Sequence, residues 1–324
     1  VSWLPPYHDM GLIGGILQPL YAGANVTLMP PIPFLQRPLR WLAAVARFGA
    51  TISGGPNFAY DLCAGKCSAE DVAGLDFGRW QVAFNGAEPI RGETLDRFAA
   101  AFAGCGFRRE AFFPCYGLAE ATLMVSCGSP PREERFAAAA LERDAAVAVP
   151  AVEPAAHRLV GSGAPANGLR VVVVDPQTAE PRAGEAVGEI WVGGPGVAQG
   201  YRGKPEESAA TFAARLAGGD GPFLRTGDLG FLHDGELFVT GRKKDLIIVR
   251  GRNLYPQDVE RTVEGCHPAL RSAVGAAFSV EVGQRLRAVR RARELSLRDV
   301  ERTSRGGWSG SGVGAYERGF PNLG

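Results

Sequence analysis

Residues 225–260 read RTGDLGFLHDGELFVTGRKKDLIIVRGRNLYPQDVE, and this stretch decides the organisation of the second half of the chain. An Asp234-Gly235 pair lies between two segments in which apolar and polar residues alternate. This pattern predicts a β-hairpin with a two-residue turn. A further strand is expected at residues 246–249, after the charged corner at 241–245.

Two features beside the hairpin suggest ligand chemistry. Asp228 is expected in a tight Thr-Gly-Asp turn, where a carboxylate accepts two hydrogen bonds from a vicinal diol such as a ribose. Arg242 is expected close enough to contact a phosphate or ribose oxygen. Beyond them, the Tyr255-Pro256 pair predicts the start of a short amphipathic helix with Val259 and Val263 on one face.

The motifs TGD, GRKKD and RGRNLYPQDVE, in this order and spacing, resemble the adenylate-forming superfamily, and in particular its fatty acyl-AMP ligase branch. A lone TGD is most often an ordinary turn, but here three motifs occur together in the order and spacing of this superfamily. The resemblance implies that Asp228 and Arg242 hold the ribose of ATP. It also implies that Asp245 is the hinge about which a small C-terminal domain turns.

Composition describes a soluble, globular chain. The 324 residues are 46% hydrophobic and 21% charged, enough for two domains. No apolar run reaches the roughly 18 residues of a membrane span, and no targeting peptide is recognised, so a cytoplasmic location is expected. The six cysteines are expected as reduced thiols. Cys63 and Cys67 lie four residues apart without a histidine, so no metal site is expected there, and His157 and His233 are interpreted as surface residues.

Near the start of the chain, the segment PPYHDMGLIGG precedes a helix predicted from Asp9, its N-cap, to about residue 22. A single histidine in the place of His8 usually caps a helix or is buried. However, this segment is similar to a fatty acyl-AMP ligase motif. The resemblance implies that His8 faces the acyl carboxylate and the α-phosphate.

Strands and helices alternate between residues 25 and 117, which predicts an α/β fold with a mostly parallel, doubly wound sheet. Ligands of such sheets lie beyond the carboxyl ends of the strands. Two loops are expected there, at residues 85–89 and 115–120.

These loops offer groups suited to a nucleotide. Gly86, Ala87 and Glu88 provide backbone donors and acceptors for an adenine edge, and Tyr116, next to Gly117, provides a ring that stacks on it. Glu120 provides an anionic oxygen for Mg²⁺, which bridges ATP phosphates. The superfamily more often has Thr or Ser at the position of Ala119, whereas YGLAEAT matches the fatty acyl-AMP ligase branch.

Residues 126–168 are rich in Ala and Pro, with one helix predicted at 132–143. Such a segment is commonly a surface linker. In position it resembles the insertion that distinguishes fatty acyl-AMP ligases from acyl-CoA synthetases. That insertion implies hindrance of the domain pose needed for coenzyme A.

We expect four regions. Residues 1–168 form a partial adenylation domain. Residues 169–244, with short strands and Gly/Pro turns, form a small β-barrel-like subdomain. Residues 245–281 form the hinge and the start of a small α+β C-terminal domain, and residues 282–324 form a helical tail.

The tail differs from the rest in charge. Residues 281–324 carry nine arginines, no lysine and five acidic residues, a net charge of four. They resemble part of a Cro/repressor-type helix-turn-helix, which implies contacts with DNA. Two alternatives remain: a basic amphipathic tail, or the joining of two unrelated coding segments, which is the interpretation we favour.

The resemblance implies a ligase that converts a fatty acid and ATP into an acyl-adenylate and passes the acyl group to an acyl carrier protein, in lipid or polyketide biosynthesis. The sequence has no STGxPKG-type phosphate loop and no lysine after Lys244. A missing transition-state charge typically costs about a hundredfold in rate, so impaired activity is expected. The alternatives are an acyl-CoA synthetase, a DNA-binding regulator acting through the tail, and an inactive product.

Overall fold

The computed structural model describes residues 1–150, 152–153, 156–166, 168–249, 252–266 and 276–278. The chain divides into two compact units, Val1–Lys243 and Lys244–Gly324. The helix-turn-helix predicted at 282–324 lies outside the described residues.

The first unit contains a five-stranded sheet of order β1-β2-β3-β4-β7. Its strands are β1 (Ile52–Gly54), β2 (Val82–Asn85), β3 (Phe112–Leu118), β4 (Leu123–Cys127) and β7 (Ala164–Pro165). The pairs β1-β2 and β2-β3 are parallel, whereas β3-β4 and β4-β7 are antiparallel. The predicted α/β class is therefore confirmed, with parallel pairing in the β1-β2-β3 part of a sheet that we expected to be mostly parallel.

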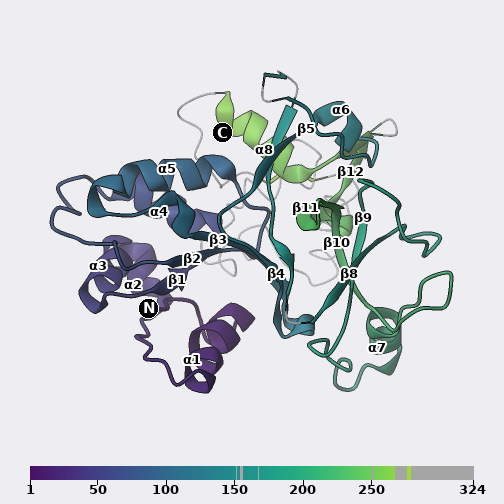
Figure 1. Cartoon of the computed structure of the whole chain (residues 1–324), viewed down its shortest axis with the longest axis horizontal. Helices are drawn as coiled ribbons and strands as arrows, with labels where there is room; N and C mark the ends of the chain where they lie inside the picture. Colours follow the sequence, from purple (N-terminus) through teal and green to yellow (C-terminus); the bar gives the residue numbers. More distant parts are fainter. Residues whose placement is uncertain (151, 154–155, 167, 250–251, 267–275, 279–324) are drawn as a thin grey trace, which may run out of the picture. The chain divides into compact units, whose positions relative to one another are not determined.

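Helices pack on one face of this sheet. They are α3 (Leu39–Phe48), α4 (Asn57–Lys66) and α5 (Gly92–Phe102), with α2 (Pro31–Gln36) beside them. Figure 1 shows α4 and α5 lying together along β2 and β3. Trp41, Tyr60 and Phe98 from the three helices meet Ala83 and Phe112 of the strands in one buried cluster. Because α4 and α5 connect successive parallel strands, they form the predicted crossovers.

The opposite face is covered by the segment that follows Asp9. It forms η1 (Met10–Leu17), a wide helical turn, which continues into α1 (Gln18–Tyr21). The Asp9 side chain accepts a hydrogen bond from the Met10 amide at 2.8 Å, at the first residue of η1. Asp9 itself has helical backbone angles, so it differs from the usual N-cap, which accepts from the second or third amide. Helical segments therefore lie on both faces of the sheet.

The predicted hairpin is present in a second, antiparallel sheet of order β11-β10-β9-β8. Its strands are β8 (Arg170–Val174), β9 (Gly188–Gly193), β10 (Leu224–His233) and β11 (Glu236–Arg242), and α7 (Pro205–Phe212) precedes β10. Asp234 and Gly235 both have positive φ, 49° and 79°, which is the turn that an Asp-Gly pair favours. Within the described residues this sheet is open and does not close into the barrel-like shape we expected.

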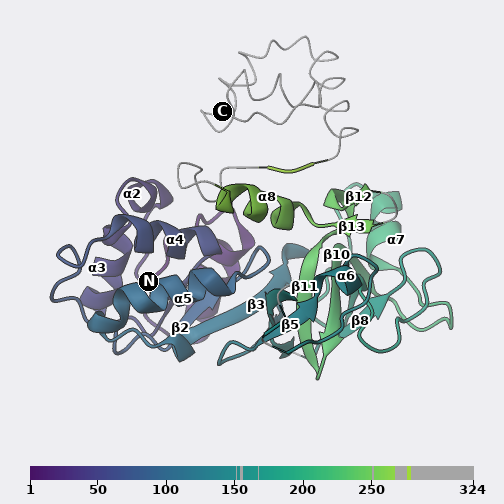
Figure 2. The same cartoon turned by 90° about the horizontal axis from the view of Figure 1, so that it is seen from above.

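Figure 2 shows helices α2–α5 gathered at one side of the first unit and strands β8, β10 and β11 at the other. The two sheets share a buried cluster that includes Tyr116 and Val125 of the first sheet with Ile190, Leu224 and Leu237 of the second. The Thr-Gly-Asp segment lies inside β10 and not in a turn beside the hairpin. The register of β10 shifts between Arg225 and Leu229, where Gly227 has a φ of 73°.

The prediction of one helix at residues 132–143 is wrong. The chain instead forms β5 (Glu133–Ala137), which pairs with β6 (Ala156–Val160), and a short α6 (Ala138–Leu141). Phe136 explains the difference, because its ring is fully buried against Phe231 and Phe238. Tertiary packing on one face of a strand overrides the helix propensity of an Ala-rich segment.

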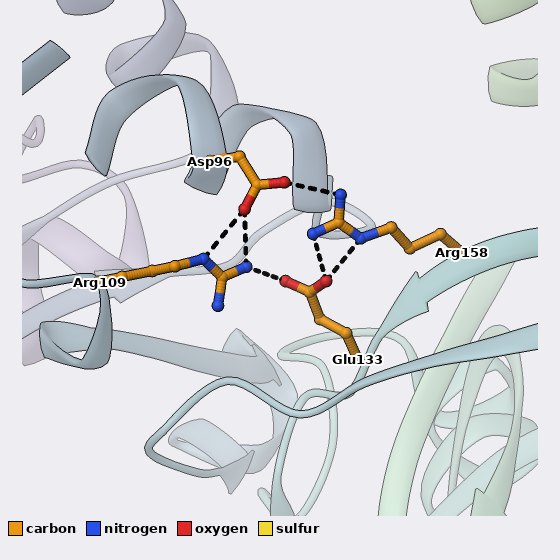
Figure 3. Close-up of polar contacts among 4 residues, drawn as sticks. All are labelled: Asp96, Arg109, Glu133 and Arg158. Carbon is orange, nitrogen blue, oxygen red and sulfur yellow. Dashed lines mark hydrogen bonds and ion pairs between the residues drawn. The ribbon is translucent and has the colours of Figure 1, made fainter. Parts of the chain in front are cut away.

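A four-residue ion cluster connects the β5-β6 hairpin to α5 (Figure 3). Arg158 donates to Asp96 at 2.7 Å and also pairs with Glu133. Arg109, in the short turn η3 (Arg109–Ala111), donates to Asp96 at 3.0 Å and to Glu133. The hydrogen bond from Arg158 lowers the pKa of Asp96, although partial burial opposes the shift. Two acids and two arginines therefore alternate around one partly buried site.

The second unit contains a strand pair, β12 (Ile247–Val249) with β13 (Arg252–Leu254), and helix α8 (Pro256–Gly265), which starts at the predicted Tyr255-Pro256 pair. The short turn η5 (Lys243–Asp245) contains Asp245. Among the described residues, no helix combines the length and the apolar character that crossing a membrane requires.

Candidate functional site

A cavity of about 550 Å³ lies in the first unit, between η1 and one face of the sheet, and reaches the carboxyl end of β3. Residues from η1, from β1–β4, from the loop after β2 and from the end of β11 line it. The predicted site residues in its wall are His8, Ala87, Tyr116, Gly117, Glu120 and Arg242. Residues far apart in the sequence are thus brought to one cavity, which reaches the edge of the sheet where ligands of α/β folds bind.

The floor of the cavity is apolar because the strands alternate their side chains. Val82 and Phe84 of β2 line the cavity, whereas Ala83 points into the helical core. On β3, Phe113 and Cys115 line it in the same way. Burial raises the pKa of Cys115 to about 12, so its thiol stays neutral. The floor can therefore accept an uncharged, flexible chain.

Tyr116 and Arg242 lie at another part of the wall, and both contact Asp228 behind them. The Tyr116 hydroxyl donates to Asp228 Oδ2 at 2.7 Å, and Arg242 Nε lies 3.3 Å from Asp228 Oδ1. Asp228 and Arg242 are register partners on β10 and β11. Burial and the neighbouring Asp228 raise the pKa of Tyr116, so its hydroxyl is a donor. Asp228 is therefore held by a hydroxyl and by a guanidinium group.

Glu120 lies in the short turn η4 (Ala119–Ala121), just beyond β3. Its Oε1 accepts a hydrogen bond from the Tyr201 hydroxyl at 2.8 Å. Among the described residues, no group of three or more His, Cys, Asp or Glu side chains is arranged to hold a metal ion. A Mg²⁺ ion commonly takes only one or two protein carboxylates and completes its shell with phosphate and water oxygens. Two carboxylates, Glu120 and Asp9, line the cavity, which fits that mode of binding.

His8 lines the same cavity at the start of η1. Its Nδ1 lies 2.6 Å from Asp9 Oδ1 and 3.2 Å from the Met10 amide nitrogen. The side chain is half exposed. His8 therefore contacts the first turn of the helix and also faces the cavity, which keeps both interpretations of this residue open.

The remaining predicted residues are not in the cavity wall. Asp228 lies behind Tyr116 and Arg242 and reaches the cavity through them. Gly86 is buried against β3, where a Cβ atom would lie 2.6 Å from the Cys115 carbonyl oxygen. Glu88 follows Ala87 at the surface. Asp245 belongs to the second unit.

Sequence reasoning missed three residues near the site. Tyr201 contacts Glu120, and the side chain of Glu189, only 3% exposed, pairs with Arg225 at 2.7 Å. Lys243 Nζ lies 3.6 Å from the same carboxylate. The sequence offered one clue to the Glu189 ion pair, the position of Arg225 directly before the TGD motif. His233 was interpreted as a surface residue, but it is 9% exposed and its Nδ1 lies 2.6 Å from Glu185 Oε1.

Comparisons with known proteins agree with this geometry. Residues 1–202 match the family described as AMP-binding enzyme. The chain is 52% identical over 287 residues to the medium-chain fatty acid–acyl carrier protein ligase JamA of Moorena producens (strain JHB), covering 87% of this chain and 48% of that protein. It is 43% identical over 293 residues to the corresponding ligase TtuA of Teredinibacter turnerae, covering 87% and 46%.

A solved structure is similar as well. The fatty acyl-adenylate ligase of L. pneumophila, in complex with acyl adenylate and pyrophosphate, matches with a TM-score of 0.73 and 48% sequence identity, over 86% of this chain and 49% of that one. The chain thus spans about half the length of the curated relatives it matches.

Proposed function

Because the chain belongs to the AMP-binding enzyme family, we propose that it activates the carboxylate of a fatty acid with ATP. In this reaction a carboxylate oxygen attacks the α-phosphorus, the bond to the β-phosphate oxygen breaks, and pyrophosphate leaves. The product is an acyl-adenylate. The medium-chain fatty acid ligases among the relatives support a fatty acid as substrate.

One observation carries this proposal: a single cavity has an apolar floor and a wall of nucleotide-type ligands. Phe84 and Phe113 lie in the floor, and Tyr116, Glu120 and Arg242 lie in the wall. An acyl-adenylate has the same two halves, an alkyl chain and a charged nucleoside phosphate. Binding both halves in one place orients the reacting carboxylate and phosphate, which lowers the entropic part of the barrier.

Each of the predicted site residues is assigned a role in binding the nucleotide. Asp228 accepts hydrogen bonds from the ribose hydroxyls, with Arg242 beside it, and Tyr116 offers its ring to the adenine. Ala87 and Gly117 shape the adenine side of the cavity. The resemblance also assigns Gly86 and Glu88 to the adenine loop, outside the wall, and Asp245 to the hinge of the C-terminal domain. These roles come from the family resemblance, and the position of Ala87, Tyr116, Gly117 and Arg242 in the cavity wall supports them.

His8 and Glu120 act on the reacting groups. His8 faces the acyl carboxylate and the α-phosphate, where a ring N–H stabilises developing negative charge. Glu120 would hold Mg²⁺, which when bound neutralises charge on the ATP phosphates. Glu120 and Asp9 are the two carboxylates that line the cavity, and a Mg²⁺ ion that takes one or two protein carboxylates completes its shell with phosphates and water.

The reaction rate of these 324 residues is proposed to be lower than that of a complete ligase. We propose that the acyl group then passes to an acyl carrier protein. In this step the phosphopantetheine thiol attacks the acyl carbonyl carbon, and AMP leaves. The carrier protein ligases among the relatives support this acceptor. The alternative acceptor is the thiol of coenzyme A.

Two measurements test the proposal. Binding of a non-hydrolysable decanoyl-sulfamoyl adenosine is expected for the chain and is expected to be lost in Asp228→Ala. Exchange of pyrophosphate into ATP is expected to require a fatty acid. A chain that binds neither the analogue nor ATP would contradict the proposal, and acyl transfer to coenzyme A in place of a holo carrier protein would contradict the acceptor.

A further inference from the structure

The loop between β9 and α7, residues 194–204, contacts the turn that contains Glu120 at three points. The Ala198 amide donates to the Glu120 carbonyl oxygen at 2.8 Å. The Thr122 hydroxyl donates to the Gly196 carbonyl oxygen at 2.6 Å. The Tyr201 hydroxyl, 81 residues away in sequence, donates to Glu120 Oε1 at 2.8 Å. Both the main chain and the side chain of Glu120 are therefore held by this one loop.

Tyr201 is itself fixed in place. Its ring packs edge-on against Phe212 of α7, with 5.0 Å between ring centroids. Its amide donates to Ser208 Oγ at 2.8 Å, on the first half of the same helix. Lys204 Nζ lies 5.8 Å from the centroid of its ring. A hydroxyl on so constrained a ring defines the rotamer of the carboxylate that accepts its hydrogen bond.

In the hydrogen bond between Tyr201 and Glu120, the hydroxyl is the donor and the carboxylate is the acceptor. A tyrosine hydroxyl ordinarily has a pKa of about 10, whereas a carboxylate is ionised at neutral pH. The hydroxyl therefore stays protonated at neutral pH and acts as the donor, and the carboxylate as the acceptor. Glu120 lines the cavity, whereas Tyr201 is not part of its wall. Any effect of Tyr201 on a ligand must pass through Glu120.

We propose that Tyr201 is a positioning residue that orients the Glu120 carboxylate for a divalent cation. The inference rests on the proposed function, because it assumes that Glu120 holds the cation that accompanies ATP. With Oε1 engaged by the hydroxyl, the carboxylate presents its remaining lone pairs to the cavity in one orientation. Partners that orient a metal-binding group in this way typically affect metal affinity by 10–100-fold.

The test compares binding of a non-hydrolysable ATP analogue with Mn²⁺, a substitute for Mg²⁺, and without metal. The readout is the factor by which Mn²⁺ tightens binding. Tyr201→Phe keeps the ring against Phe212 and removes only the hydroxyl. We expect this variant to lower the Mn²⁺ factor by about tenfold, with little change in metal-free binding. The matched control is Tyr21→Phe, at a tyrosine that is 91% exposed, and it should change neither value.

Glu120→Gln separates this inference from the proposed function. If Glu120→Gln removes the Mn²⁺ factor and Tyr201→Phe leaves it intact, the positioning role is overturned and the metal role of Glu120 stands. If neither variant changes the factor, or the unaltered chain shows none, the metal role fails and the inference fails with it. If both variants lower it, adding Tyr201→Phe to Glu120→Gln should have no further effect, because coupled residues are not additive. A further, independent loss in that double variant would count against the inference.

Discussion

The Tyr116 hydroxyl donates a hydrogen bond to Asp228 Oδ2 at 2.7 Å, although the two residues are 112 positions apart. This bond connects the end of β3 to β10 and thereby joins the two sheets at the cavity. Sequence motifs suggested separate roles for the two residues, an aromatic platform and a ribose acceptor. Their contact means that the hydroxyl of one fixes the carboxylate of the other.

Removing this hydroxyl should weaken nucleotide binding. Tyr116→Phe keeps the ring and leaves Asp228 with Arg242 as its charged partner. A hydrogen bond to a charged group contributes about 1.5 kcal/mol, so we expect roughly tenfold weaker binding of decanoyl-sulfamoyl adenosine. Titration calorimetry measures the change. Equal affinity in Tyr116→Phe and in the exposed control Tyr21→Phe would show that the bond has no role in binding.

The ion cluster of Figure 3 should contribute measurably to stability. Glu133→Gln leaves Arg109 and Arg158 with only Asp96 as their acid in the cluster. The site is partly buried, between the limits for exposed and buried ion pairs, so we expect a loss of about 1–2 kcal/mol in the free energy of unfolding. Urea denaturation measures it, with the exposed Glu70→Gln as control.

Salt provides an independent check on the origin of that loss. Screening weakens interactions between charges that water can reach, so the difference between Glu133→Gln and the unaltered chain should shrink in about 1 M salt. A difference that does not respond to salt would indicate lost packing and not lost ion pairing.

The elements that could be predicted from sequence are those encoded locally. The Asp234-Gly235 turn and its flanking alternation predicted the hairpin, since an Asp-Gly pair readily adopts the positive φ angles of a two-residue turn. The Tyr255-Pro256 pair predicted the start of helix α8 (Pro256–Gly265), because proline is favoured at the first position of a helix. In both cases the evidence lies within a few residues of the element.

The elements that could not be predicted depend on partners far away in the sequence. Residues 132–143 have the composition of a helix, but Phe136 packs against β10 and β11 and pairs its segment with β6. The sequence motifs indicated Tyr116, Glu120 and Asp228 separately, each as a candidate nucleotide-binding residue. It gave no sign that Tyr201 contacts Glu120 or that Glu185 contacts His233, because no local pattern encodes a hydrogen bond between distant strands and loops.

Acid should selectively destabilise the site around Glu189. Burial alone would raise the pKa of Glu189, but Arg225 and Lys243 outweigh it, so the net pKa is lowered. A lowered pKa in the folded state means that the unfolded chain binds more protons in acid. The stabilisation by Glu189 is therefore present above its ordinary pKa of about 4.3 and is lost as the pH falls through the lowered value.

Glu189→Gln tests this sign. The variant should be less stable than the unaltered chain near neutral pH, since it leaves Arg225 without its carboxylate partner. The difference in unfolding free energy should shrink as urea titrations are repeated at steps from about pH 6 to about pH 3. A difference that stays constant over that interval would mean that the charge of Glu189 is not what stabilises the site.

The size of Phe84 should limit the length of the acyl chain that the cavity accepts. Its ring lines the apolar floor, beside Val82 and opposite the polar wall. Phe84→Ala enlarges the floor, and each further methylene buried there contributes about 0.8 kcal/mol, or roughly fourfold in affinity. In a series of acyl-sulfamoyl adenosines of increasing length, we therefore expect the optimum to move to longer chains in Phe84→Ala. The control Phe48→Ala, at an exposed phenylalanine on α3, should keep the original optimum. An unchanged optimum in Phe84→Ala, with binding otherwise retained, would place the limit on chain length elsewhere in the cavity.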